Sequence, residues 1–204
     1  MKRIIIPIVF LISLAIILFI VFTNANSLLT EKRAKEIGEE KYLKFLWIVD
    51  GAFNSNRLDG DFTVNGKKLD NKDKLFTCKY KNSKSSECIG NNFETEFKNL
   101  FSKKISYEKV YSDGAIYSWI TYVDGKYVFN NTDSCSINRM NTTHELEVVS
   151  IENDKLVLEV KFKNNSINQV NTKNFELILE DNEWKISNAF YYDICGMQYV
   201  IGLQ

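Results

Sequence analysis

The sequence predicts an α+β domain behind one N-terminal transmembrane helix, with helices packed on a curved antiparallel β-meander sheet. Three observations support this prediction. Residues 4–22 are almost entirely apolar, residues 31–101 contain two segments with helical spacing of apolar positions, and residues 115–190 alternate apolar and polar positions between turn residues. Helices that precede a run of paired strands are typical of α+β domains.

The membrane segment is the first element. An apolar helix over residues 4–22, rising about 1.5 Å per residue, nearly crosses the hydrocarbon core of a bilayer. Lys2 and Arg3 precede it and the next basic residue, Lys32, comes much later, so the positive-inside rule places the rest of the chain outside the cytoplasm. A cleaved signal peptide is the alternative, because Thr23-Asn24-Ala25 offers small residues for cleavage.

The domain division follows from this segment. We assign residues 1–23 to a membrane anchor or signal segment, 24–30 to a short tether and 31–204 to a single extracytoplasmic domain. The expected location is therefore the cell membrane with one crossing, or the exterior if the segment is cleaved. Lys plus Arg equals Asp plus Glu at 26 each, so no net field favours nucleic acid and we expect no such partner. The Asn-, Lys- and Ile-rich composition is one we associate with bacteria of AT-rich genome.

Four cysteines follow the membrane segment, and an oxidising compartment favours disulfides. They are Cys78, Cys88, Cys135 and Cys195, and three connectivities are open to them. We favour Cys78 with Cys88, because only the short polar loop from Lys79 to Glu87 separates them, which leaves Cys135 with Cys195. A zinc site is a weaker alternative, since the chain has no C-x-x-C pair. We expect no metal and no cofactor.

Three helices are expected in the first half of the domain. The first begins after the cap Thr30 and ends at Gly51, with one buried face and an enclosed last turn. The second follows the cap Asn92 and places Phe93, Phe97, Leu100 and Phe101 on one face. A third, of one or two turns, follows the cap Ser106 and ends at Gly114.

The strands are expected in hairpins. Asn65-Gly66 is a strong turn signal between residues 62–64 and 67–69, and residues 75–80 form another strand. Later hairpins pair 116–123 with 127–129, 146–151 with 156–162, and 175–179 with 184–190. Leu156, Leu158, Val160 and Phe162 share the face that should cover the core. Residues 164–171 are interpreted as a long polar loop.

Catalytic residue types are scarce. His144 is the only histidine, it belongs to no motif, and we interpret it as a solvated position at the start of a strand. Paired carboxylates could serve a hydrolase, with Asp50, Asp61, Asp113 and Asp124 as possible members. All of these except Asp61 precede Gly, which favours turns. Tyr117 and Trp119 share one face of their predicted strand, so an exposed aromatic surface for a protein or a glycan is a candidate binding surface, with burial as the equal alternative.

Three phrases carry a resemblance to known families. Residues 175–187 resemble the closing hairpin of small secreted bacterial domains, both those like nuclear transport factor 2 and those like IseA. Residues 29–34 and 97–104 extend the resemblance to IseA-like inhibitors of cell-wall DL-endopeptidases, over about half of the exported part. This resemblance implies a non-enzymatic protein that blocks a hydrolase. The four cysteines and the anchor depart from the pattern, and no inhibitory position can be matched.

The first functional hypothesis is therefore a non-catalytic, membrane-anchored protein-binding domain at the cell surface that inhibits or regulates a cell-wall hydrolase. The second is a small-ligand-binding module similar to nuclear transport factor 2, which would need a deep pocket lined by Phe93, Phe97, Trp119 and Trp184. The third is a carboxylate-based hydrolase, which would need two acidic side chains converging in a cleft.

Overall fold

The computed structural model describes residues 29–53, 63–68, 77–82, 85–89, 93–106, 109–112, 115–118, 120–124, 126–130, 142–164, 168–192 and 198–202. The predicted membrane segment, Trp119, Cys135 and Cys195 lie outside these residues. Within the described part, no helix is both long and apolar enough to cross a membrane. The domain has the α+β composition that the sequence predicts.

Two helices and thirteen strands make up the described part of the chain. In chain order they are α2 (Glu31–Phe53), β1 (Thr63–Val64), β2 (Lys67–Lys68), β3 (Thr77–Asn82), β4 (Ser85–Ile89), α3 (Phe93–Leu100), β5 (Lys109–Ser112), β6 (Ala115–Ser118), β7 (Ile120–Val123), β8 (Lys126–Asn130), β9 (Thr142–Ile151), β10 (Lys155–Asn164), β11 (Gln169–Glu180), β12 (Glu183–Tyr192) and β13 (Gln198–Gly202).

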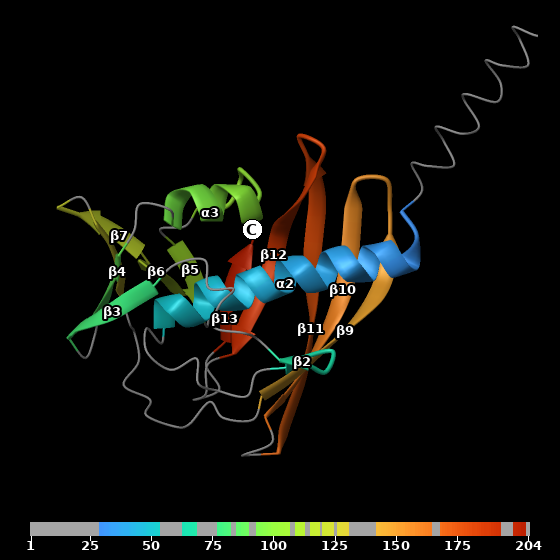
Figure 1. The fold of residues 1–204 in the computed structure, drawn as a ribbon, viewed down its shortest axis with the longest axis horizontal. Helices are drawn as coiled ribbons and strands as arrows, with labels where there is room; N and C mark the ends of the chain where they lie inside the picture. The colour runs from blue at the N-terminus through green and yellow to red at the C-terminus, as the bar shows by residue number, and fades with distance from the viewer. Residues whose placement is uncertain are drawn as a thin grey trace, which may run out of the picture.

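The strands form two sheets rather than the single meander that the sequence predicts. Within the described residues, one sheet has nine strands in the order β2-β1-β9-β10-β11-β12-β13-β5-β6, and the other has four in the order β3-β4-β8-β7. Helix α2 lies across the long strands β9 to β12, and the four-stranded sheet lies beyond the C-terminal end of α2 (Figure 1). The large sheet is also mixed, because β1 runs parallel to β9.

The core lies between α2, α3 and one face of β9 to β12. Phe45, Leu46, Trp47 and Ile48 are all at most 5% exposed, which confirms the enclosed last turns predicted for the first helix. The predicted strand face is confirmed too, since Leu156, Leu158, Val160 and Phe162 are buried. On α3 the buried residues are the predicted ones, with Phe97 and Phe101 stacked at 4.1 Å between ring centroids.

Gly38 sets the distance between α2 and the sheet. A Cβ atom at this position would lie 2.2 Å from Cδ2 of Leu158, which is fully buried on β10. Only glycine therefore lets the helix backbone approach so closely. Ala34 and Tyr42, one turn before and one turn after Gly38, are buried on the same face of the helix.

The predicted short helix after Ser106 is wrong. Residues Lys109–Ser112 form β5, which pairs with β6 and, at Tyr111, with Val200 of β13. Val110 and Tyr111 are residue types that favour strands, and pairing on both sides outweighs a local capping signal. The strand predicted over 116–123 is likewise divided, since β6 joins the large sheet and β7 the small one.

Three boundaries differ from the predictions for a common reason. The first helix continues past Gly51 to Phe53, the presumed loop between the first two cysteines is mostly the paired strands β3 and β4, and the polar loop after Asn164 ends where β11 begins at Gln169. In the helix, propagation of the regular backbone carries α2 past a glycine. In the two strand regions, pairing with a neighbouring strand keeps polar residues in the sheet. The Asn65-Gly66 turn is confirmed, with φ of 48° and 76°.

Replacing Gly38 by alanine should destabilise the domain. Alanine improves helix propensity by about 1 kcal/mol, but overpacking against buried Leu158 costs about 1–3 kcal/mol. We expect a net loss of about 1 kcal/mol in the free energy of unfolding, measured by urea denaturation. The double variant Gly38→Ala/Leu158→Val is the control, because trimming Leu158 makes room and should recover part of the loss relative to the sum of the two single changes. If the losses in the free energy of unfolding of the two single variants simply added up in the double variant, the close contact between position 38 and Leu158 would be contradicted.

The backbone register supports the preferred pairing of two cysteines. Cys78 of β3 and Cys88 of β4 are direct cross-strand partners. Cα atoms at such positions are about 4.5–5.5 Å apart, within the range that a disulfide spans. We expect peptide mapping by mass spectrometry without reductant to yield a Cys78–Cys88 linked fragment. A fragment joining either residue to Cys135 or Cys195 would refute the pairing.

Candidate functional site

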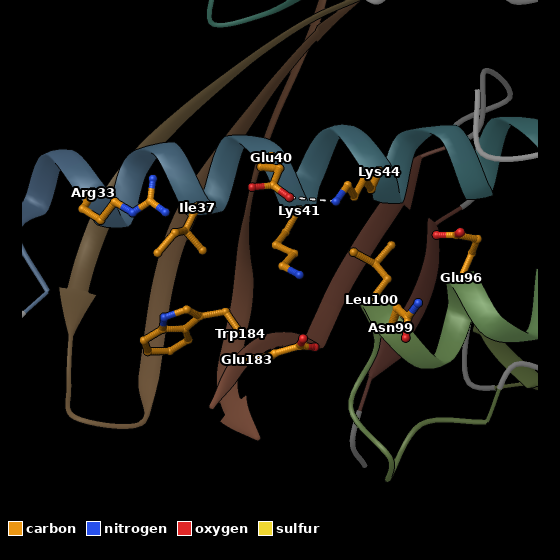
Figure 2. A pocket seen from close by; sticks show the side chains of 10 residues that line it. All are labelled: Arg33, Ile37, Glu40, Lys41, Lys44, Glu96, Asn99, Leu100, Glu183 and Trp184. Atoms are coloured by element: carbon orange, nitrogen blue, oxygen red, sulfur yellow. Dashed lines mark hydrogen bonds and ion pairs between the residues drawn. The ribbon is translucent and has the colours of Figure 1, made fainter. Parts of the chain in front are cut away.

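A groove of about 470 Å³ opens between α2, α3 and the start of β12. Figure 2 shows α2 along one side, with the β11–β12 turn and α3 opposite it. The residues that line it are Arg33, Ile37, Glu40, Lys41 and Lys44 of α2, Glu96, Asn99 and Leu100 of α3, and Glu183 and Trp184 of β12. We take this groove as the candidate functional site.

The groove face of α2 follows from helical spacing. Ile37, Lys41 and Lys44 recur at intervals of four and three, so they form one stripe on the helix. This stripe lies beside the buried stripe of Ala34 and Tyr42 that contacts the sheet. The core contact of α2 thereby fixes which side chains enter the groove.

A tight turn places the aromatic side chain. Asp181 and Asn182 have φ of 51° and 63°, the left-handed values of a two-residue hairpin turn that matches strand twist. Glu180 and Glu183 are paired across this turn, and β12 begins at Glu183. Trp184 therefore enters the groove from the second residue of β12, where it is half-buried and packs against the core cluster.

The end of α3 is bound to the same hairpin. Ser102 N donates to the carbonyl of Ile186 at 2.8 Å, and Lys185 Nζ donates to the carbonyl of Asn99 at 2.6 Å. Glu180 accepts hydrogen bonds from Ser102 Oγ at 2.7 Å and Lys103 N at 3.1 Å. Burial raises the pKa of Glu180, but these two donors, together with the charges of Lys103 and Lys104, lower it further than burial raises it. The two walls opposite α2 are thus one connected unit.

Most charges in the groove are paired. Lys44 Nζ lies 2.7 Å from Glu40 Oε1, and Lys185 Nζ lies 2.6 Å from Glu183 Oε2. Lys41 differs from them, because it is half-buried and has no hydrogen-bond or ion-pair partner among the described residues. Burial lowers the pKa of Lys41, and the neighbouring Lys44 and Lys185 lower it further against smaller opposing effects of Glu40 and Glu183. Among the described residues that line the groove, Lys41 is therefore the one lysine without an ion pair.

His144 is not where the sequence suggested. It is 3% exposed on β9, and its Nδ1 lies 2.8 Å from the hydroxyl of Tyr42. Its ring also meets Phe162 edge-on at 5.2 Å between centroids. The prediction of a solvated residue is wrong because β9 turns this position toward α2, as its partners Phe162 and Val64 show. Burial lowers the pKa of His144 to about 3, so it is neutral at physiological pH.

The remaining candidates are not brought together at the groove. Asp124 has φ of 51° at the end of β7, a turn position as predicted. The backbone of Tyr117 belongs to β6 at an edge of the large sheet, while Trp119 lies outside the described residues, so their surface stays a prediction. Phe93 and Phe97 are buried in the packed core, and Trp184, the other described member of the proposed pocket set, lines the groove. The described residues contain no group of three metal-ligating side chains.

Sequence reasoning missed Lys41. The usable signal was its position between two apolar residues at helical spacing, four residues after Ile37 and four before Phe45. A lysine at such a position either covers apolar surface with its stem or presents a charge in a sheltered place.

Comparison with protein-family models and with curated proteins finds no match for this chain.

The buried histidine predicts a specific loss of stability in acid. Because the folded pKa is about 3 and the ordinary value is 6.5, the unfolded state takes up a proton first, and stability is complete above pH 6.5 and lost as pH falls toward 3. Between pH 7 and pH 5 the wild-type chain should lose about 2 kcal/mol more than the variant His144→Gln. Urea unfolding at both pH values measures this difference. Equal losses in the two proteins would contradict a neutral buried imidazole.

Proposed function

We propose that this chain is a non-catalytic protein-binding domain, held by residues 4–22 to the outside of a bacterial cell membrane, and that it inhibits a cell-wall hydrolase. The observation that carries the binding role is the groove, in which a sheltered ammonium group without a partner lies beside a half-buried tryptophan. Tryptophan in a concave, partly desolvated site is typical of the residues that dominate protein interfaces. The partner class comes from the resemblance of residues 29–34, 97–104 and 175–187 to IseA-like inhibitors.

The way in which the groove is built supports recognition of a protein. Its walls are α2 and the unit formed by α3 with the β11–β12 hairpin, and hydrogen bonds and packing fix both walls in advance. A preformed site spends little free energy on ordering itself when a partner binds. Its charged residues suit a polar, extended segment better than an enclosed apolar ligand.

The tether gives the binding role a location. If the segment over residues 4–22 is retained, α2 begins only a few residues beyond the bilayer, and the groove lies along that helix. A partner at the inner side of the cell wall would then be bound close to the membrane. We therefore place the inhibited hydrolase in the space between membrane and wall.

The test uses the full chain in detergent micelles with purified DL-endopeptidases of the cell wall. We expect the chain to lower hydrolysis of peptidoglycan fragments, because a bound inhibitor covers the hydrolase active site. The variant Trp184→Ala should weaken inhibition about tenfold, the effect of losing a central aromatic contact of more than 1 kcal/mol.

The matched control is Val149→Ala, which removes an exposed apolar side chain on β9 far from the groove residues in sequence and should leave inhibition unchanged. Unaltered hydrolysis at micromolar concentrations of the wild-type chain, with no complex detected by ultracentrifugation, would refute the proposal.

A further inference from the structure

We infer that the groove binds an acidic side chain of a peptide segment, with an aromatic or aliphatic neighbour of that residue resting on Trp184. This inference rests on the proposed function, because it names the part of the protein partner that the groove would hold. It goes further in fixing the chemistry of recognition to one carboxylate and one apolar group.

The first reason is the charge balance around Lys41. Glu40 and Glu183 already bind Lys44 and Lys185, so their negative charges are committed. Lys44 and Lys185 repel Lys41, Glu40 and Glu183 offset that repulsion only in part, and Lys41 has no hydrogen bond or ion pair among the described residues. A carboxylate entering the groove would gain a charge-assisted hydrogen bond and relieve that repulsion.

The second reason is the apolar surface beside that charge. Figure 2 shows the Lys41 side chain directed into the groove between Trp184 and Leu100, with Ile37 above the indole. Trp184 and Ile37 are each half-buried, so they offer apolar area that a small side chain can still cover. A group next to the carboxylate would therefore meet an aromatic face.

The third reason concerns how many acidic groups the groove accepts. Glu96 of α3 has no described ion pair, and Figure 2 places it at the opposite end of the groove from Trp184. A second acidic side chain at that end would be repelled. The volume of about 470 Å³ also suits a segment of few residues rather than a whole helix.

The experiment uses the full chain in micelles and three blocked dipeptides as probes. They are acetyl-Asp-Phe-amide, its uncharged analogue acetyl-Asn-Phe-amide, and acetyl-Asp-Ala-amide, which lacks the aromatic ring. The chain is labelled with fluorotryptophan, and the fluorine NMR signal of Trp184 is assigned by its loss in Trp184→Phe. The three tryptophans make the spectrum simple.

We expect acetyl-Asp-Phe-amide to shift the Trp184 signal with a dissociation constant in the millimolar range, and each of the other probes to bind at least fivefold more weakly. The variant Lys41→Gln should abolish the preference for Asp over Asn. It should not lower the unfolding temperature, because it removes an unpaired charge from a sheltered place.

The control is Lys98→Gln on α3, whose ammonium group is exposed, pairs with Glu94 and does not line the groove. This variant should keep the full preference. Equal affinities for the Asp and Asn probes, or a preference that persists in Lys41→Gln, would overturn the inference. A marked loss of stability in Lys41→Gln would also overturn it, because Lys41 would then be a packing residue.

Failure here is distinguishable from failure of the proposed function. If the chain inhibits a hydrolase equally well with Lys41→Gln, the inhibitory role stands and acidic recognition fails. If the probes bind as expected and no hydrolase is inhibited, acidic recognition stands and the partner class fails.

Discussion

The close approach of α2 to the large sheet is the constraint on which the rest of the structure depends. Gly38 brings the helix backbone against Leu158, and the aromatic ring of Tyr42 then reaches Phe175 on β11 at 5.1 Å between centroids. With that face fixed, the adjoining stripe of α2 can only face α3 and the β11–β12 hairpin. The position of the groove is thus a consequence of how the core is packed.

The same packing determines the electrostatics of the groove. Ion pairs such as Glu40 with Lys44 cost little to form on an exposed helix surface and contribute only a few tenths of a kcal/mol. A half-buried lysine without an ion pair is different, since desolvation opposes its charge and the attraction of Glu40 and Glu183 offsets this only in part. Ionisable groups with shifted pKa values cluster at functional sites. If the groove binds a carboxylate, as inferred above, stability and recognition oppose each other at Lys41.

The sequence predicted the parts of the fold that local patterns encode. The spacing of Phe93 and Phe97 predicted α3, and the alternation from Leu156 to Phe162 predicted which face of β10 is buried. It could not predict that Tyr111 pairs with Val200, because no local sequence pattern identifies a strand partner almost ninety residues away. The site was less predictable still. The sequence suggested Trp184 only as one wall of an interior pocket. The electrostatic environment of Lys41 depends on Lys44 of the same helix and on Lys185 of β12, and only the fold brings Lys185 close.

The position of β13 has a consequence for how the domain acquires its structure. This strand, the last one described along the chain, lies between β12 and β5, so it joins the β5–β6 hairpin to the strands under α2. Until residues 198–202 emerge, that hairpin has no place to dock on the large sheet. Pairings so distant in sequence form late, because loop closure must precede any gain from contact. If the chain is exported N-terminus first, as proposed, its larger sheet would be complete only after residues 198–202 have passed the translocation pore.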